Sequence, residues 1–161
     1  MSEKSKDKFF AESHGKLLTV KLGDQEYGVP IHEAREVVGM LNIDPVPRTS
    51  NFMKGVINLR GKIVPVIDLR LKFGLEEKKV SKETCIIVVD ISGKMTGIIV
   101  DQLIGVVTVD AENYEPSPRL GSNINAEFIS GMVKLEKRVI IVLEIENVLD
   151  NRDLEHINSA V

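Results

Sequence analysis

The stretch FMKGVINLRGKIVPVIDL, residues 52–69, carries the pattern from which the rest of the chain can be interpreted. Two apolar runs flank Gly61, and a glycine in a short connection between such runs is typical of a β-hairpin. We expect the hairpin to turn on Gly61 and Lys62, as a type II′ turn. Counting from that turn gives one wholly apolar face, which must be the core side: Ile57, Leu59, Val64 and Val66.

The opposite face of this hairpin mixes apolar and polar side chains. It carries Val56, Asn58, Arg60, Ile63, Pro65 and Ile67. Because proline has no N–H to donate to a ladder, the strand is expected to have an open edge at Pro65. Such a mixed, partly apolar surface has the composition of a binding patch.

The same pattern occurs a second time in the chain. Residues 52–69 align without a gap on residues 128–145, FISGMVKLEKRVIIVLEI, and the upstream NIDPVPR from Asn42 corresponds to NYEPSPR from Asn113. Each copy is too small to bury much surface alone. We therefore expect two packed units, at about residues 15–80 and 82–150, joined through the charged residues 74–83. Whether the units exchange strands stays open.

Short apolar runs rich in Val and Ile predict a mostly β fold of the barrel or sandwich kind. Strands are expected at residues 17–22, 27–31, 54–59, 62–67, 84–91, 95–100, 105–109, 129–135 and 138–143, with another near 40–46. Short helices are predicted at residues 32–38 and 68–73, the second capped by Asp68. Residues 1–14 and 151–161 are expected to be a disordered tail and a C-terminal tail.

Composition and motifs exclude several kinds of function. A net charge of −3 and 4% aromatic residues disfavour nucleic-acid binding, and the polar start of the chain indicates a cytoplasmic protein without membrane insertion. His14, His32 and His156 have no metal-ligand spacing, so neither metal nor cofactor is expected. The single cysteine, Cys85, is interpreted as a small buried thiol. No catalytic motif is found, and the chain is predicted not to be an enzyme.

Arg60 stands at the tip of the first hairpin, where the second copy has Glu136. The fold itself therefore does not require an arginine at this position. Two interpretations remain open from the residues alone. Arg60 is either a solvated cation in an incidental surface ion pair, or it recognises another molecule.

The chain resembles the CheW family of chemotaxis coupling proteins from about Leu17 to Leu149. FMKGVINLRGKIVPVIDLRLKFG is the most specific segment, and LGDQEYGVPIHEAREVVG, GIIVDQLIGV, YEPSP and EFISGMVKLEKRVIIVLEIENVL support it. The resemblance implies two five-stranded Src-homology-3-like barrels packed around a shared core. It implies a non-catalytic adaptor between the cytoplasmic tip of methyl-accepting chemoreceptors and the regulatory domain of the histidine kinase CheA. Association with membrane-bound receptor arrays, through protein contacts and rings with other CheW copies, follows from it too.

The resemblance also implies a receptor-binding groove beside the first hairpin. Its matching positions, with the apolar residues around Arg60, are Ala34, Glu36, Gly55, Val56, Asn58, Arg60, Gly61 and Ile63. In this interpretation the Arg60 guanidinium makes bidentate hydrogen bonds to the receptor, and Ile67 helps to exclude water. Ala34 is smaller than the β-branched residue common in the family. Kinase-contacting residues stay unassigned. The alternative to an adaptor is a double β-barrel that binds a small molecule or nucleic acid. A third class, a small hydrolase, would need paired ionisable groups in a pocket.

Overall fold

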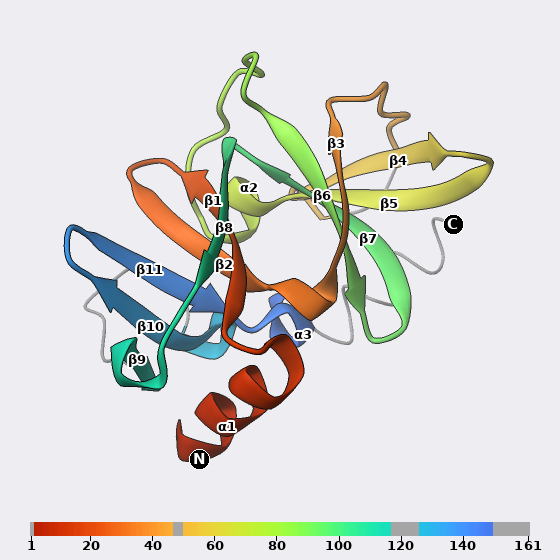
Figure 1. The fold of residues 1–161 in the computed structure, drawn as a ribbon. Helices are drawn as coiled ribbons and strands as arrows, with labels where there is room; N and C mark the ends of the chain where they lie inside the picture. The colour runs from red at the N-terminus through yellow and green to blue at the C-terminus, as the bar shows by residue number, and fades with distance from the viewer. Residues whose placement is uncertain (1, 47–49, 117–125, 150–161) are drawn as a thin grey trace.

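The structure is a computed structural model that describes residues 2–46, 50–116 and 126–149. Two sheets dominate it (Figure 1). The six-stranded sheet has the order β8 (Gln102–Thr108), β1 (Lys16–Leu22), β2 (Gln25–Pro30), β11 (Arg138–Leu143), β10 (Ile129–Leu135) and β9 (Tyr114–Pro116). The five-stranded sheet has the order β3 (Ala34–Gly39), β6 (Cys85–Ile91), β7 (Lys94–Val100), β5 (Lys62–Asp68) and β4 (Met53–Leu59). The predicted mostly β architecture is confirmed.

The two halves of the chain exchange hairpins. The β1–β2 hairpin of the first half lies in the six-stranded sheet, where β2 runs parallel to β11. The β6–β7 hairpin of the second half lies in the five-stranded sheet, where β7 runs parallel to β5. Each sheet therefore contains strands from both copies of the repeat, and neither sheet is complete without the other half of the chain.

The repeat predicted from sequence is visible as matching contacts in the two halves. The Asp68 N–H donates to the Phe52 carbonyl at 2.7 Å, and the Glu144 N–H donates to the Phe128 carbonyl at the same distance. The exchanged hairpins match each other too, because each has a close-packed glycine on its second strand against a side chain of its first strand. A Cβ at Gly28 would lie 2.9 Å from Leu17 Cδ1, and a Cβ at Gly97 would lie 2.8 Å from Ile86 Cγ2.

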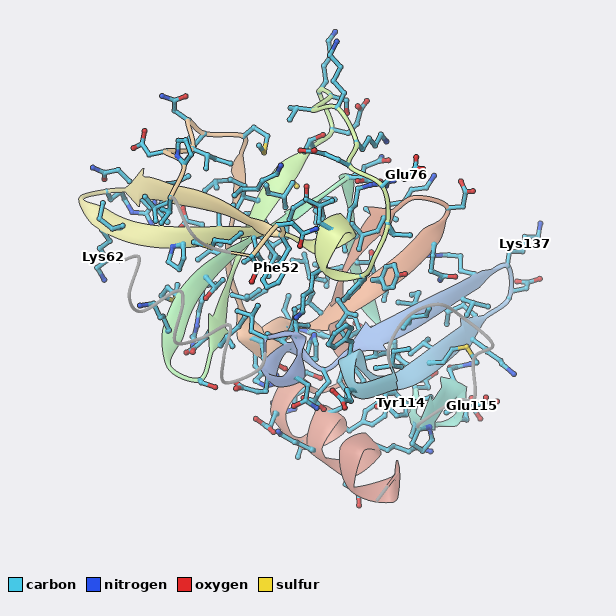
Figure 2. All side chains as sticks on the ribbon, turned by 180° about the vertical axis from the view of Figure 1, so that it is seen from behind. Phe52, Lys62, Glu76, Tyr114, Glu115 and Lys137 are labelled. Atoms are coloured by element: carbon cyan, nitrogen blue, oxygen red, sulfur yellow. The ribbon has the colours of Figure 1, made fainter. Side chains whose placement is uncertain are left out.

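Apolar side chains from both sheets form one shared core. Val20 and Tyr27 of the six-stranded sheet pack in the same cluster as Ile87 and Ile98 of the five-stranded sheet. Phe52 lies in this cluster near the middle of the molecule, while Lys62 and Lys137 mark two hairpin tips on opposite sides (Figure 2). Each sheet also has a smaller cluster of its own. The expected shared hydrophobic core is therefore present.

The short helix after β5 forms as predicted. Helix α2 (Leu69–Lys72) begins after Asp68, whose carboxylate accepts hydrogen bonds from the N–H groups of Arg70 and Leu71. Its repeat counterpart α3 (Ile145–Val148) begins after Glu144 and has no side-chain cap. Within the described ranges, the other short helical segments are 3₁₀ turns at Ile31–Glu33, Ala111–Asn113 and Ala126–Phe128.

The helix predicted over residues 32–38 is wrong. A 3₁₀ turn covers Ile31–Glu33 and strand β3 follows, with half-buried and exposed residues in alternation from Ala34 to Gly39. Pairing with the buried strand β6 decides the outcome, because a period of two suits a strand at the edge of a sheet. Near residues 40–46 the structure has an isolated bridge between Asp44 and Val56 rather than a full strand.

The start of the chain differs from the expected disordered tail. Helix α1 (Ser2–Ser13) packs against β9 and β10. Phe9 is only 4% exposed and stacks on Tyr114 with ring centroids 5.3 Å apart. One well-buried aromatic residue among the charges holds the helix on the body, a contact that overall polarity does not reveal. The C-terminal tail predicted at residues 151–161 lies outside the described residues. None of the helices described has the length and apolar character of a membrane span.

Candidate functional site

The hairpin that carries Arg60 turns one residue earlier than predicted. Leu59 pairs with Lys62, so Arg60 and Gly61 form the two-residue loop. Both have positive φ, 52° and 86°, which makes this a type I′ turn instead of type II′. The shift moves the pairing register by two residues and leaves every side chain on its predicted face. Ile57, Val64 and Val66 are buried, as expected.

Arg60 is an unusual residue for this turn. A type I′ turn favours Asn or Gly at its first central position, because other side chains adopt positive φ at a cost. Asn58 supports the loop, since its Oδ1 accepts a hydrogen bond from the Gly61 N–H at 2.8 Å. The local backbone therefore accommodates Arg60 without requiring it.

The guanidinium of Arg60 meets a carboxylate from its own chain. Its Nη1 lies 2.7 Å from Glu36 Oε2 and its Nη2 lies 2.5 Å from Glu36 Oε1, a bidentate arrangement. These bonds lower the pKa of Glu36 and raise that of Arg60. The Arg60 side chain is nevertheless 70% exposed, against 29% for Glu36. The surface ion pair that was one of the two interpretations of Arg60 is therefore present. Its partner could not be identified from the sequence because Glu36 lies 24 residues away along the chain.

The pair connects the two outer strands of the five-stranded sheet. Glu36 lies on β3 at one edge, and Arg60 follows β4 at the other. The bridge between Asp44 and Val56 also links the segment after β3 to β4, with N–H to carbonyl distances of 2.9 Å in both directions. The sheet therefore curls until its edges approach each other, as expected for a barrel-like unit.

A groove of about 450 Å³ lies beside this pair. Five of its lining residues come from the first hairpin, one from β3, and three from the β6–β7 turn and the start of β7 in the other half of the chain: Leu59, Arg60, Lys62, Ile63, Val64, Glu36, Gly93, Lys94 and Met95. Ile63 is 50% exposed and supplies apolar surface next to the charged pair. Sequence reasoning missed the contribution of the β6–β7 turn because it depends on the hairpin exchange.

The remaining predicted positions lie differently. Ala34 and Val56 are half-buried and pack against the shared core. Gly55 is buried, and a Cβ there would lie 2.1 Å from the Asp44 carbonyl oxygen, so its glycine permits the approach of that segment. Ile67 is fully buried and cannot shield Arg60 from water, contrary to the prediction. Pro65 lies just outside the stretch of β5 that pairs with β7, which begins at Val66.

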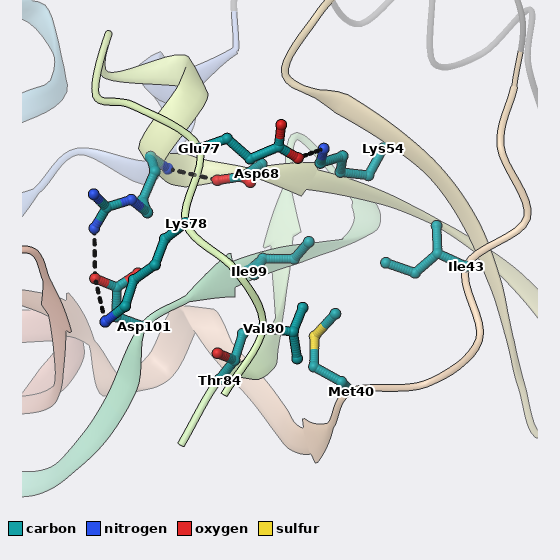
Figure 3. A pocket seen from close by; sticks show the side chains of 11 residues that line it. Met40, Ile43, Lys54, Asp68, Glu77, Lys78, Val80, Thr84, Ile99 and Asp101 are labelled. Atoms are coloured by element: carbon teal, nitrogen blue, oxygen red, sulfur yellow. Dashed lines mark hydrogen bonds and ion pairs between the residues drawn. The ribbon is translucent and has the colours of Figure 1, made fainter. Parts of the chain in front are cut away.

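A second cavity, of about 240 Å³, lies between α2, the segment before β6 and the segment after β3 (Figure 3). Met40, Ile43 and Val80 give it an apolar side. Its charged side chains pair with one another: Arg70 Nη1 lies 2.6 Å from Asp101 Oδ2, and Lys54 bonds Glu77. Since these charges are compensated within the chain, the cavity offers little for a charged ligand.

The chemistry of the other singled-out residues is structural. Cys85 is buried, as predicted, and burial raises the pKa of its thiol. Asp101 accepts a hydrogen bond from the Gly23 N–H at 2.8 Å in addition to its pair with Arg70. Within the described ranges, no three His, Cys, Asp or Glu side chains are arranged to hold a metal ion.

The fold defines the class of this chain, a duplicated and mostly β protein whose halves share one core. Residues 16–153 match the family model of the CheW-like domain. Chemotaxis protein CheW of Klebsiella aerogenes is 33% identical over 89% of this chain and 87% of its own length, and that of Helicobacter pylori is 36% identical over 80% and 77%. The chain belongs to the CheW family of chemotaxis scaffold proteins.

A solved structure agrees with this assignment. The scaffolding protein TtCheW from Thermoanaerobacter tengcongensis superimposes with a TM-score of 0.80 and is 35% identical in sequence. The match covers 86% of this chain and 94% of that one.

Proposed function

We propose that this chain is a non-catalytic adaptor that couples methyl-accepting chemoreceptors to the histidine kinase CheA and helps to assemble receptor arrays. The groove beside Glu36 and Arg60 is the receptor-binding site in this proposal; Ala34, Gly55 and Val56, which the family resemblance also implies, do not line it. The adaptor acts at the cytoplasmic tip of the receptors and reaches the membrane only through protein contacts. The regulatory domain of CheA and other copies of the adaptor are its further partners.

The observation that carries the proposal is the exposed bidentate pair at the turn. Arg60 occupies a backbone conformation that favours Asn or Gly, yet it is held in one orientation by Glu36 while 70% of its side chain stays accessible. An immobilised guanidinium loses less conformational entropy when it binds, which favours hydrogen bonds to a partner. Neighbouring Ile63 adds apolar area that excludes water from such bonds.

The test uses two charge reversals at equivalent hairpin tips. Lys137 lies at the tip of the β10–β11 hairpin, on the opposite side of the molecule from Lys62 (Figure 2). Arg60→Glu and Lys137→Glu change the net charge equally. We expect Arg60→Glu to abolish co-sedimentation with a receptor cytoplasmic fragment and CheA, and Lys137→Glu to leave it intact. Both variants should keep the wild-type thermal midpoint. Normal assembly by Arg60→Glu would refute the role assigned to the groove.

A variant with both charges reversed distinguishes a direct contact between Arg60 and the receptor from a role of the ion pair in holding the hairpin. Glu36→Arg combined with Arg60→Glu restores the ion pair with the charges exchanged. If Arg60 itself contacts the receptor, the double variant stays defective. Recovery of assembly would show instead that the pair only holds the hairpin in place.

A further inference from the structure

A second group of residues, all charged or titratable except Gly93, lies beneath helix α1; Gly93 also lines the groove. The group surrounds a cavity of about 250 Å³, and its members come from α1, the 3₁₀ turn, β3, β6, the β6–β7 turn and α3: Lys8, Glu12, His32, Glu33, Arg35, Asp90, Gly93 and Glu146. An adjoining cavity of about 30 Å³ is lined by Lys8, Phe9 and Glu144 together with Glu33. Helix α1 therefore covers both Glu33 and Glu144.

Glu33 is the centre of this group. Its side chain is only 14% exposed, and its Oε2 is buried without a hydrogen-bond partner, as is His32 Nδ1. The Nε2 of His32 lies 3.2 Å from Glu12 Oε2 on α1 and 3.8 Å from Glu33 Oε1. The pair with Glu12 carries opposite charges only when His32 is protonated.

The charges that face Glu33 are mostly negative. Glu12 faces it from α1, and Glu144 and Glu146 face it from the end of β11 and from α3; Lys8 of α1 is the opposing cation. Two of the remaining charges on the cavity neutralise each other, and Glu146 also has hydrogen-bond donors of its own. Arg35 pairs with Asp90 at 3.1 Å, and Glu146 accepts hydrogen bonds from the N–H and hydroxyl of Ser92.

We propose that helix α1 is a pH-sensitive cover, held on the body when Glu33 and Glu144 are protonated and loosened when they ionise. An ionised Glu33 would be a carboxylate enclosed by three others, with one oxygen unsatisfied. Lifting α1 removes both the repulsion of Glu12 and the attraction of Lys8, so the gain on opening is the access of water to both carboxylates. Lifting α1 also exposes Phe9 and breaks its contact with Tyr114, which opposes opening.

The direction of the effect follows from proton linkage. Burial first, and then the neighbouring Glu144, raise the pKa of Glu33 from 4.5 to about 7, and burial also raises the pKa of Glu144. The covered state therefore binds more protons than the open state, so docking of α1 weakens as the pH rises toward 7 and changes little above it. The whole shift of Glu33 would correspond to a fall of about 25-fold in the docking equilibrium between roughly pH 5.5 and pH 8, and this is an upper bound because Glu144 and Glu146 belong to the body and keep part of the shift when α1 lifts.

Amide hydrogen exchange of the full chain tests the proposal. An isolated 12-residue helix is marginal in water, so the α1 amides lose protection whenever the helix undocks. Protection of residues 6–13 is measured between about pH 5.5 and pH 8, corrected for intrinsic exchange rates, with strand β6 as the internal reference for the folded body. Four variants accompany the wild type. Glu33→Gln and Glu144→Gln remove the proposed groups, Glu136→Gln is an exposed control on the far hairpin, and Phe9→Ala marks the undocked state.

The wild type and Glu136→Gln should lose at least fivefold of their α1 protection across this range, while β6 stays protected. Glu33→Gln should keep most of its α1 protection across the range, with a small loss left by Glu144; Glu144→Gln should show a smaller loss than the wild type, and Phe9→Ala should have low protection throughout. Constant α1 protection in the wild type, or an undiminished loss in Glu33→Gln, would overturn the proposal.

Discussion

The cap of helix α2 gives a quantitative test, because the repeat supplies its own control. Asp68 is 5% exposed and accepts hydrogen bonds from the N–H groups of Arg70 at 2.9 Å and Leu71 at 3.4 Å. Only the first distance is that of a strong bond. Loss of an N-cap costs about 1 kcal/mol on average, and burial of the unpaired N–H groups adds to this. We expect Asp68→Ala to lower the free energy of unfolding by about 1.5 kcal/mol.

For a chain of this size the loss corresponds to a fall of about 3–6 °C in Tm. Glu144 occupies the equivalent position in the second copy. Burial raises the pKa of both carboxyls, but only Asp68 has cap hydrogen bonds that oppose this effect. Glu144→Gln should therefore raise the stability at pH 7. Urea unfolding followed by circular dichroism measures both changes. Equal effects of the same sign at the two positions, or no loss in Asp68→Ala, would refute the reasoning.

Two further predictions concern the free energy of unfolding, measured in the same urea assay. Gly55→Ala should lower it by about 3 kcal/mol, because the new Cβ would lie 2.1 Å from the Asp44 carbonyl oxygen at a φ of 144°. Gly61→Ala should lower it by about 1 kcal/mol, because its φ is 86° but the space around it is open. Glu33→Gln should be more stable than the wild type by about 3 kcal/mol at pH 8, since the ionised wild-type carboxyl has a pKa raised from 4.5 to about 7. That difference should shrink toward zero as the pH falls from 7 to 4.5, and a constant difference across this range would contradict it.

Much of the fold follows from local patterns in the sequence. The alternation of side chains along the strands predicts which residues of the first hairpin face the core. This assignment is correct even though the turn lies one residue earlier than expected, because a two-residue shift of register keeps each side chain on the same face. The helix expected at residues 32–38 does not form, because seven residues of mixed polarity fit either the helix or the strand period, and pairing with β6 favours the strand.

The exchange of hairpins could not be predicted, since pairing of β2 with β11 and of β5 with β7 joins distant segments. The repeat within those hairpins is also hard to detect in the sequence. Its clearest signal is the pair of close-packed glycines, Gly28 and Gly97, among apolar residues that differ in identity. The Glu36 partner of Arg60 was hidden for a related reason, because the curl of a sheet brings its two edges together without leaving a local pattern.

The location of the receptor site is the central claim, and amide chemical-shift mapping tests it most directly. The isotope-labelled chain is titrated with a receptor cytoplasmic fragment that contains the tip. We predict that the largest shifts cluster at Glu36, residues 58–61 and Ile63, and that the tip of the β10–β11 hairpin, at Glu136 and Lys137, stays unperturbed. Shifts centred on that second hairpin, with none around Arg60, would contradict the account.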